Sequence, residues 1–204
     1  MPFPMLSFSR KGGRPMRKLT LSIEQDDSPE SPREHGGLSK MVCFHRRYQL
    51  GDKHDLTIEE AKALYPKMQK EGVALPLYLY DHSGIGMSTS NTQYPFNCPW
   101  DSGQVGFIYA DRKMILEMFG KEKLTKGMKG ACLSNLQKEV ETYNQYLQGD
   151  VYGYVIKDEQ GDCIDSCWGF YGEEDAKEQG ASALKWQNEN DAKEVEEAKK
   201  IMAL

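Results

Sequence analysis

Residues 151–170, VYGYVIKDEQGDCIDSCWGF, decide the fold class because they contain two strand-like runs joined by a short turn. The runs are 151–158 and 162–170, and the turn between them contains the tripeptide EQG. A connection this short joins antiparallel strands, whereas parallel strands need a crossover of about a dozen residues or more. The stretch therefore predicts a β-hairpin.

A second hairpin is expected earlier in the chain. PLYLY (76–80) and IGMS (85–88) are strand-like and flank DHSG (81–84), whose residue types favour a turn. Further strands are expected at 18–25, 41–44 and 104–110. The segments 26–40 and 89–103 lack periodicity and predict two long loops.

Helices are expected between the strands. Thr57 and Glu60 form a capping box at the start of one helix, and Pro66 inside it predicts a kink or an early end. Asp111 is expected to cap a short helix at 112–119. A second capping box at Ser134 predicts the start of a helix that ends before residue 149.

The order of elements predicts an α+β fold, with a mainly antiparallel or mixed sheet built of hairpins and helices packed on one face. Residues 1–18 are expected to be a flexible leader, with Met16 as a possible true start. Residues 19–172 are expected to form a single α+β domain. Residues 173–204 are expected to form a C-terminal tail of one or two helices, which Gly180 weakens.

Charge and hydropathy exclude two broad classes of partner. The net charge is −5, and residues 1–18 carry five basic and no acidic residues, so the rest of the chain is strongly acidic. General nucleic-acid binding is not expected, because it depends on phosphate neutralisation by Lys and Arg. No apolar run approaches the roughly 20 residues of a membrane span, so no membrane partner is expected.

The five cysteines are an odd number in a chain without a secretory signal, which favours reduced thiols and a cytoplasmic location. Their spacing, like that of the four histidines, forms no paired ligand pattern. Neither a metal nor a cofactor is predicted.

Three short segments combine an acid with a hydroxyl, two of them directly beside an expected strand and the third within one, which suggests a catalytic site. A hydrolase or nuclease would need a base beside a hydroxyl, oriented by an acid. The alternative is turn chemistry, because Asp and Ser side chains bind nearby backbone amides. The candidate catalytic residues are Asp81, His82, Ser83, Asp101, Ser102, Asp165 and Ser166.

Candidate ligand-binding residues come from two further groups. Arg33, Arg46 and Arg47 lie in or beside the first long loop and could hold an anion or a nucleotide, although surface salt bridges explain them equally well. His45 lies two residues after a cysteine and could form a Cys–His pair or remain a core histidine. The aromatic candidates for a pocket wall are Trp100 and Trp168.

Several blocks of this sequence resemble a widespread set of uncharacterised proteins of phages and mobile elements. The resemblance covers residues 19–172, and the sequence departs from it at 35–37, where HGG replaces an expected acidic–amide pair. The blocks are SPRE (31–34), MVCFHRRYQLGDKH (41–54), LYLYDHSG (77–84), PWDSGQVGFIY (99–109), EVETYNQYLQGDVYGY (139–154) and DSCWGFYG (165–172).

The resemblance implies an accessory protein of a phage or mobile element, with a host-interaction or defence-countering role and an unknown host protein as its partner. It implies no activity, so no catalytic residue follows from it. The residues leave two alternatives open, a small hydrolase or nuclease and a small-anion or nucleotide binder.

Overall fold

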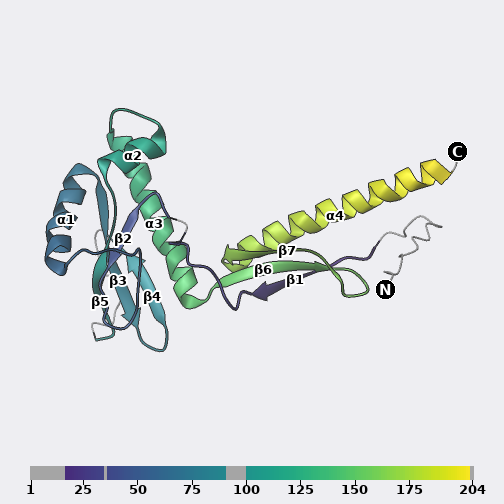
Figure 1. The fold of residues 1–204 in the computed structure, drawn as a ribbon, viewed down its shortest axis with the longest axis horizontal. Helices are drawn as coiled ribbons and strands as arrows, with labels where there is room; N and C mark the ends of the chain where they lie inside the picture. The colour runs from purple at the N-terminus through teal and green to yellow at the C-terminus, as the bar shows by residue number, and fades with distance from the viewer. Residues whose placement is uncertain (1–16, 35, 91–99, 203–204) are drawn as a thin grey trace, which may run out of the picture. The chain divides into compact units, whose positions relative to one another are not determined.

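A computed structural model describes residues 17–34, 36–90 and 100–202, so the expected leader up to Met16 lies outside the described residues. The described chain contains strands and helices in mixed order (Figure 1). They are β1 Thr20–Gln25, β2 Lys40–Cys43, α1 Ile58–Glu71, β3 Val73–Asp81, β4 Ile85–Thr89, β5 Ser102–Ala110, α2 Arg112–Phe119, α3 Lys126–Gln148, β6 Val151–Lys157, β7 Cys163–Tyr171 and α4 Glu173–Met202.

The chain divides into two compact units. Of the described residues, those up to 25 and from 152 onward form one unit, and those between 26 and 151 form the other. We call them the outer unit and the inner unit, after their places in the sequence. The expected boundary at residue 172 does not follow this division, because α4 packs on β1 and β7 within the outer unit. Whether residues 19–172 fold as one domain stays a prediction.

The inner unit contains a four-stranded antiparallel sheet in the order β2-β5-β3-β4. The hairpin predicted around DHSG is the β3–β4 pair, with Asp81 opposite Ile85. The α+β class and the largely antiparallel pairing are therefore confirmed.

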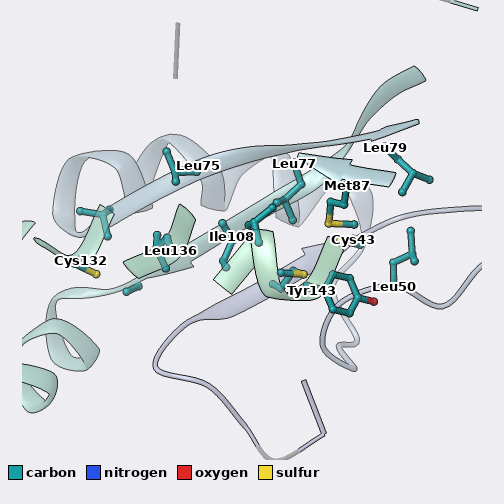
Figure 2. Close-up of a cluster of buried hydrophobic side chains, with 14 of the residues drawn as sticks. Cys43, Leu50, Leu75, Leu77, Leu79, Met87, Ile108, Cys132, Leu136 and Tyr143 are labelled. Carbon is teal, nitrogen blue, oxygen red and sulfur yellow. The ribbon is translucent and has the colours of Figure 1, made fainter. Parts of the chain in front are cut away.

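The main core of the inner unit lies between one face of this sheet and α3. Leu75, Leu77 and Leu79 alternate along β3 and point to this face, as the two-residue repeat of a strand requires. Leu136 and Tyr143 of α3 meet them, and Figure 2 shows these side chains converging. The helix α2 adds Ile115, which is fully buried, to the same core.

The opposite face of the same sheet is covered by α1, which differs from the expectation of helices on one face. Ala61 of α1 packs with Val42 and Phe107 in a second, smaller core. The first half of β3 is consequently buried on both faces, which explains the continuous apolar run of its sequence. Pro76 is tolerated there because β4 pairs with β3 only from Leu77 onward.

Two of the three predicted helix starts are confirmed. The capping box at Thr57 and Glu60 is present. The helix α1 continues through Pro66 to Glu71, so it does not end early at the proline, and the alternative of a kink stays a prediction. Asp111 caps α2 as expected. The predicted start of the next helix at Ser134 is also wrong, because α3 begins after Thr125, whose hydroxyl accepts the Met128 N–H.

The outer unit contains the three-stranded sheet β1-β6-β7 and the single long helix α4. A Cβ atom on Gly180 would lie 2.9 Å from Leu21 Cδ1 and 2.9 Å from Tyr154 Cβ. Because Leu21 and Tyr154 lie on one face of the β1–β6 pair, α4 covers that face. Gly180, which weakened the helix prediction, is the residue that lets the helix approach the sheet.

Candidate functional site

Two of the three acid–hydroxyl segments meet at one end of the inner unit's sheet. Tyr80 pairs with Ser102 across β3 and β5, and the Asp81 N–H donates to the Asp101 carbonyl at 2.8 Å. Because β2 is antiparallel to β5, the residues after β2 also emerge here. We call residues 45–48, 81–84 and 100–102 the sheet end.

The third segment, with the candidates Asp165 and Ser166, lies on β7 of the outer unit. The carboxylate of Asp165 accepts a hydrogen bond from the Tyr154 hydroxyl at 3.4 Å. Trp168, on the same strand, lies over Gly153 of β6. These residues form a separate group within the outer unit.

An ion pair and two aromatic contacts organise the sheet end. Arg47 donates to the carboxylate of Asp81, and His45 Nε2 lies 3.9 Å from the same carboxylate oxygen. The His45 ring stacks on Tyr48 at 5.1 Å between centroids, and the Arg47 guanidinium lies 5.6 Å from the Tyr48 ring. The Asp81 carboxylate therefore lies between the Arg47 guanidinium and the His45 ring, and the Asp81 side chain is 19% exposed.

His82 and Ser83 form an arrangement at the sheet end that resembles a nucleophile and its base. His82 Nδ1 lies 3.1 Å from Ser83 Oγ, within hydrogen-bonding distance. The contact forms because Ser83 adopts φ 58 in the β3–β4 turn, where the His82 N–H also donates to the Gly84 carbonyl. The carboxylate of Asp81, the acid next to His82 in the sequence, contacts Arg47 and His45.

Trp100 is the most exposed large apolar side chain of the described chain, at 93%. It precedes Asp101, whose carbonyl is fixed by Asp81. The backbone next to the indole is thus tied to β3 while the ring projects into solvent.

Arg33 lies in a different environment from the other candidate arginines. Its guanidinium donates to both carboxylate oxygens of Asp52, at 2.8 and 2.9 Å, and to Glu139 at 2.6 Å. Ser39, which is fully buried, donates to the same Glu139 oxygen at 2.6 Å. Although burial opposes its charge, the hydrogen bonds to Asp52 and Glu139 raise the pKa of Arg33 overall. The side chain is only 5% exposed, and it ties the first long loop to α3.

The three arginines therefore have different surroundings. Arg33 holds Asp52 and Glu139, whereas Arg47 holds Asp81, and Arg46 is exposed. The anion-binding hypothesis, which requires them to converge, gains no support from these contacts.

The described cysteines differ in burial, since Cys43 and Cys132 are buried whereas Cys163 and Cys167 are exposed. Burial raises the pKa of Cys43 to about 12 and that of Cys132 to about 11, so both thiols stay protonated near neutral pH. Cys163 and Cys167 are free and exposed. In residues 17–34, 36–90 and 100–202, no group of three or more His, Cys, Asp or Glu side chains could hold a metal ion.

A groove beside the sheet end was not predicted. It has a volume of about 850 Å³ and runs between β4 and α3 of the inner unit. Asn144 of α3 accepts the N–H of Met87, at the outer edge of β4, at 2.8 Å, and His82 lies at the rim of the groove. The polar residues of α3 that line the groove recur at helical spacing, so the sequence alone could have indicated a polar flank on this helix. They are Gln137, Glu141, Asn144 and Gln148.

Comparisons with protein-family models, with curated proteins and with solved structures return no match. Among the described helices, none has the length and apolar character needed to cross a membrane.

Proposed function

We propose that this chain is a binding protein that contacts a host protein through the sheet end, as a cytoplasmic accessory protein of a phage or mobile element. The exposure of Trp100 carries the proposal. An indole of this size in solvent is unfavourable for an isolated chain, and tryptophan is enriched among the residues that dominate binding energy at protein interfaces.

The residues around Trp100 fit the same role. Arg47 and Tyr48 belong to the other two residue types enriched at such positions. The ion pair between Arg47 and Asp81 orders the arginine before a partner arrives, which lowers the entropy lost on binding. The adjoining groove along β4 offers room for a segment of that partner.

Affinity purification of the tagged full-length chain from bacterial cells tests the proposal. We expect at least one host protein to be enriched by the unmodified chain and lost with Trp100→Ala. For a purified partner, truncating a dominant tryptophan should weaken binding by about 30-fold or more.

Trp186→Ala is the matched control, because Trp186 is also exposed, at 59%, but lies on α4 of the outer unit. It should leave the enrichment unchanged. Equal loss with both variants, or no reproducible partner for the unmodified chain, would argue against binding through the sheet end.

The contact between His82 and Ser83 favours a hydrolase as the second candidate function. An activated serine reacts with fluorophosphonate probes, whereas an ordinary turn serine does not. Labelling of Ser83 that disappears in both Ser83→Ala and His82→Gln would support this candidate. If Ser83 is not labelled, the hydrolase candidate is wrong, and the contact between His82 and Ser83 only stabilises the β3–β4 turn.

A further inference from the structure

The groove between β4 and α3 is long, because a strand forms one wall and a helix forms the other (Figure 1). The strand wall is β4, whose 5 residues span about 16 Å at about 3.3 Å each. The helix wall runs from Gln137 to Gln148, which also spans about 16 Å at about 1.5 Å per residue. This length fits an extended segment of about five residues.

The strand wall presents backbone groups to the groove. In the sheet order β2-β5-β3-β4, β4 pairs with β3 on one side and has α3 on the other. The Met87 N–H donates to Asn144 Oδ1 of α3 at 2.8 Å, so it points away from β3. The Gly84 carbonyl accepts from His82 within the turn, so the Ile85 N–H on the opposite side of that planar peptide also points away from β3. One wall of the groove is therefore partly main chain.

The helix wall holds its carboxamide groups in defined orientations. Asn144 Nδ2 donates to Gln148 Oε1 at 3.3 Å, which leaves Gln148 Nε2 as a donor beside Gly86. Gln145 Nε2 donates to the carboxylate of Asp150 at 3.3 Å, which leaves Gln145 Oε1 as an acceptor. A donor and an acceptor on the same wall match the C=O and N–H groups of a peptide backbone.

The charge of the groove wall is negative. Among the described residues that line it, Glu141 is the single carboxylate, and none is Lys or Arg. Lys138 precedes Glu141 by about one helical turn but does not line the groove. An exposed carboxylate in an otherwise uncharged groove attracts a cation and repels an anion.

We propose that the groove binds an extended, basic segment of the host protein, which lies along β4. A Lys or Arg side chain of this segment pairs with Glu141. The backbone of the segment accepts a hydrogen bond from Gln148 Nε2 and donates one to Gln145 Oε1. This binding mode rests on the proposed function, because the segment belongs to the same host protein that contacts Trp100.

The chemistry of the groove favours a basic peptide over other occupants. An anionic ligand would face Glu141 without a cation to balance it. A second copy of this chain is strongly acidic outside residues 1–18, so most of its surface carries the same sign of charge as the groove. A free polyamine would pair with Glu141 but would leave the acceptor of Gln145 unused by any backbone amide.

A blocked peptide of alternating lysine and serine, titrated into the full-length chain, tests the charge and the location. We expect the amide resonances of β4 and of the second half of α3 to shift at low ionic strength. The shifts should shrink as salt is added, because salt screens an exposed ion pair. The analogue with glutamate in place of lysine should cause no such shifts. Unshifted resonances of β4 and α3, or equal binding of the two peptides, would overturn the proposal.

Variants separate the charge from the carboxamides. Glu141→Gln should weaken binding of the lysine peptide by about three- to fivefold. Glu71→Gln, at an exposed acid at the end of α1, is the matched control and should leave the affinity unchanged. Gln145→Ala combined with Gln148→Ala should weaken binding by about tenfold, with the circular dichroism retained. A double variant that binds as tightly as the unmodified chain would overturn the assignment of a peptide, since the groove would then recognise charge alone.

The titration and the affinity purification fail independently. Capture of a host protein through Trp100, without any shift of β4 and α3 by the lysine peptide, would leave the proposed function standing and overturn the role of the groove. A peptide that binds in the groove of a chain that captures no host protein would overturn the proposed function and identify the groove as a basic-peptide site.

Discussion

Arg33 contacts two carboxylates far from it in the sequence, and its replacement should leave both unpaired. Removing one partner of a buried ion pair is costly, but Asp52 and Glu139 are 14% and 24% exposed and regain some hydration. We expect Arg33→Met to lower the free energy of unfolding by about 2–4 kcal/mol, measured by denaturant titration. Arg46→Met, at an exposed position, should change it by less than about 0.5 kcal/mol. Similar effects of the two variants would show that the buried network contributes little.

The cysteines give a second test at the scale of single residues. The thiolate is the reactive form, and burial keeps the Cys43 and Cys132 thiols protonated and covered. With iodoacetamide at about pH 8, mass spectrometry should show Cys163 and Cys167 modified first. Cys43 and Cys132 should react only in denaturant. Modification of Cys43 in the folded chain as fast as Cys163 would contradict its buried position.

At this scale the sequence predicted neighbours only where strand pairing brings them together. Asp81 and Asp101 were both candidate residues at strand ends, and the Asp81 N–H binds the Asp101 carbonyl because β3 pairs with β5. The partners of Arg33 come from a separate loop and from α3, so local patterns contained no signal for them. Arg33 was therefore a candidate ligand-binding residue in the sequence, whereas its guanidinium is paired with Asp52 and Glu139 in the structure.

Substituting Gly130 or Gly180 with alanine distinguishes the effect of intrinsic helix propensity from that of packing, because only Gly180 is crowded. Gly130 of α3 has open space around its Cβ position, so Gly130→Ala should stabilise the chain by about 0.5–1 kcal/mol. Gly180→Ala gains the same propensity, but its Cβ would lie 2.9 Å from atoms of Leu21 and Tyr154. We expect it to destabilise the chain by about 1–2 kcal/mol, since the crowded helix must move off the sheet. Both values come from denaturant titrations, and stabilisation by both variants would show that α4 does not pack this closely.

The helices also show why element boundaries were only partly predictable. The capping boxes at Thr57 and Ser134 look alike in sequence, yet only Thr57 begins a helix. Thr125 caps α3 instead, and the helix passes through Ser134 because Cys132 and Leu136 on either side are fully buried in the core. Tertiary burial overrides a local signal worth about 1 kcal/mol.

At the scale of the whole molecule, the main question is whether the inner unit is an independent folding unit. Its ends are adjacent, because the Asp26 N–H donates to the Val151 carbonyl at 2.8 Å. Its main core, from Met41 to Tyr143, lies entirely within residues 26–151. The sequence could not show this, because hydrophobic periodicity identifies faces of elements but not which elements share a core.

We therefore expect a chain of residues 26–151 alone to fold. It should show a cooperative thermal transition by circular dichroism and dispersed amide resonances, since no core residue is lost. Leu75→Ala, at a fully buried position, should destabilise this fragment and the full-length chain alike, by about 2–5 kcal/mol. A fragment that unfolds without a cooperative transition, or that tolerates Leu75→Ala when the full-length chain does not, would mean that its core forms only when the outer unit is present.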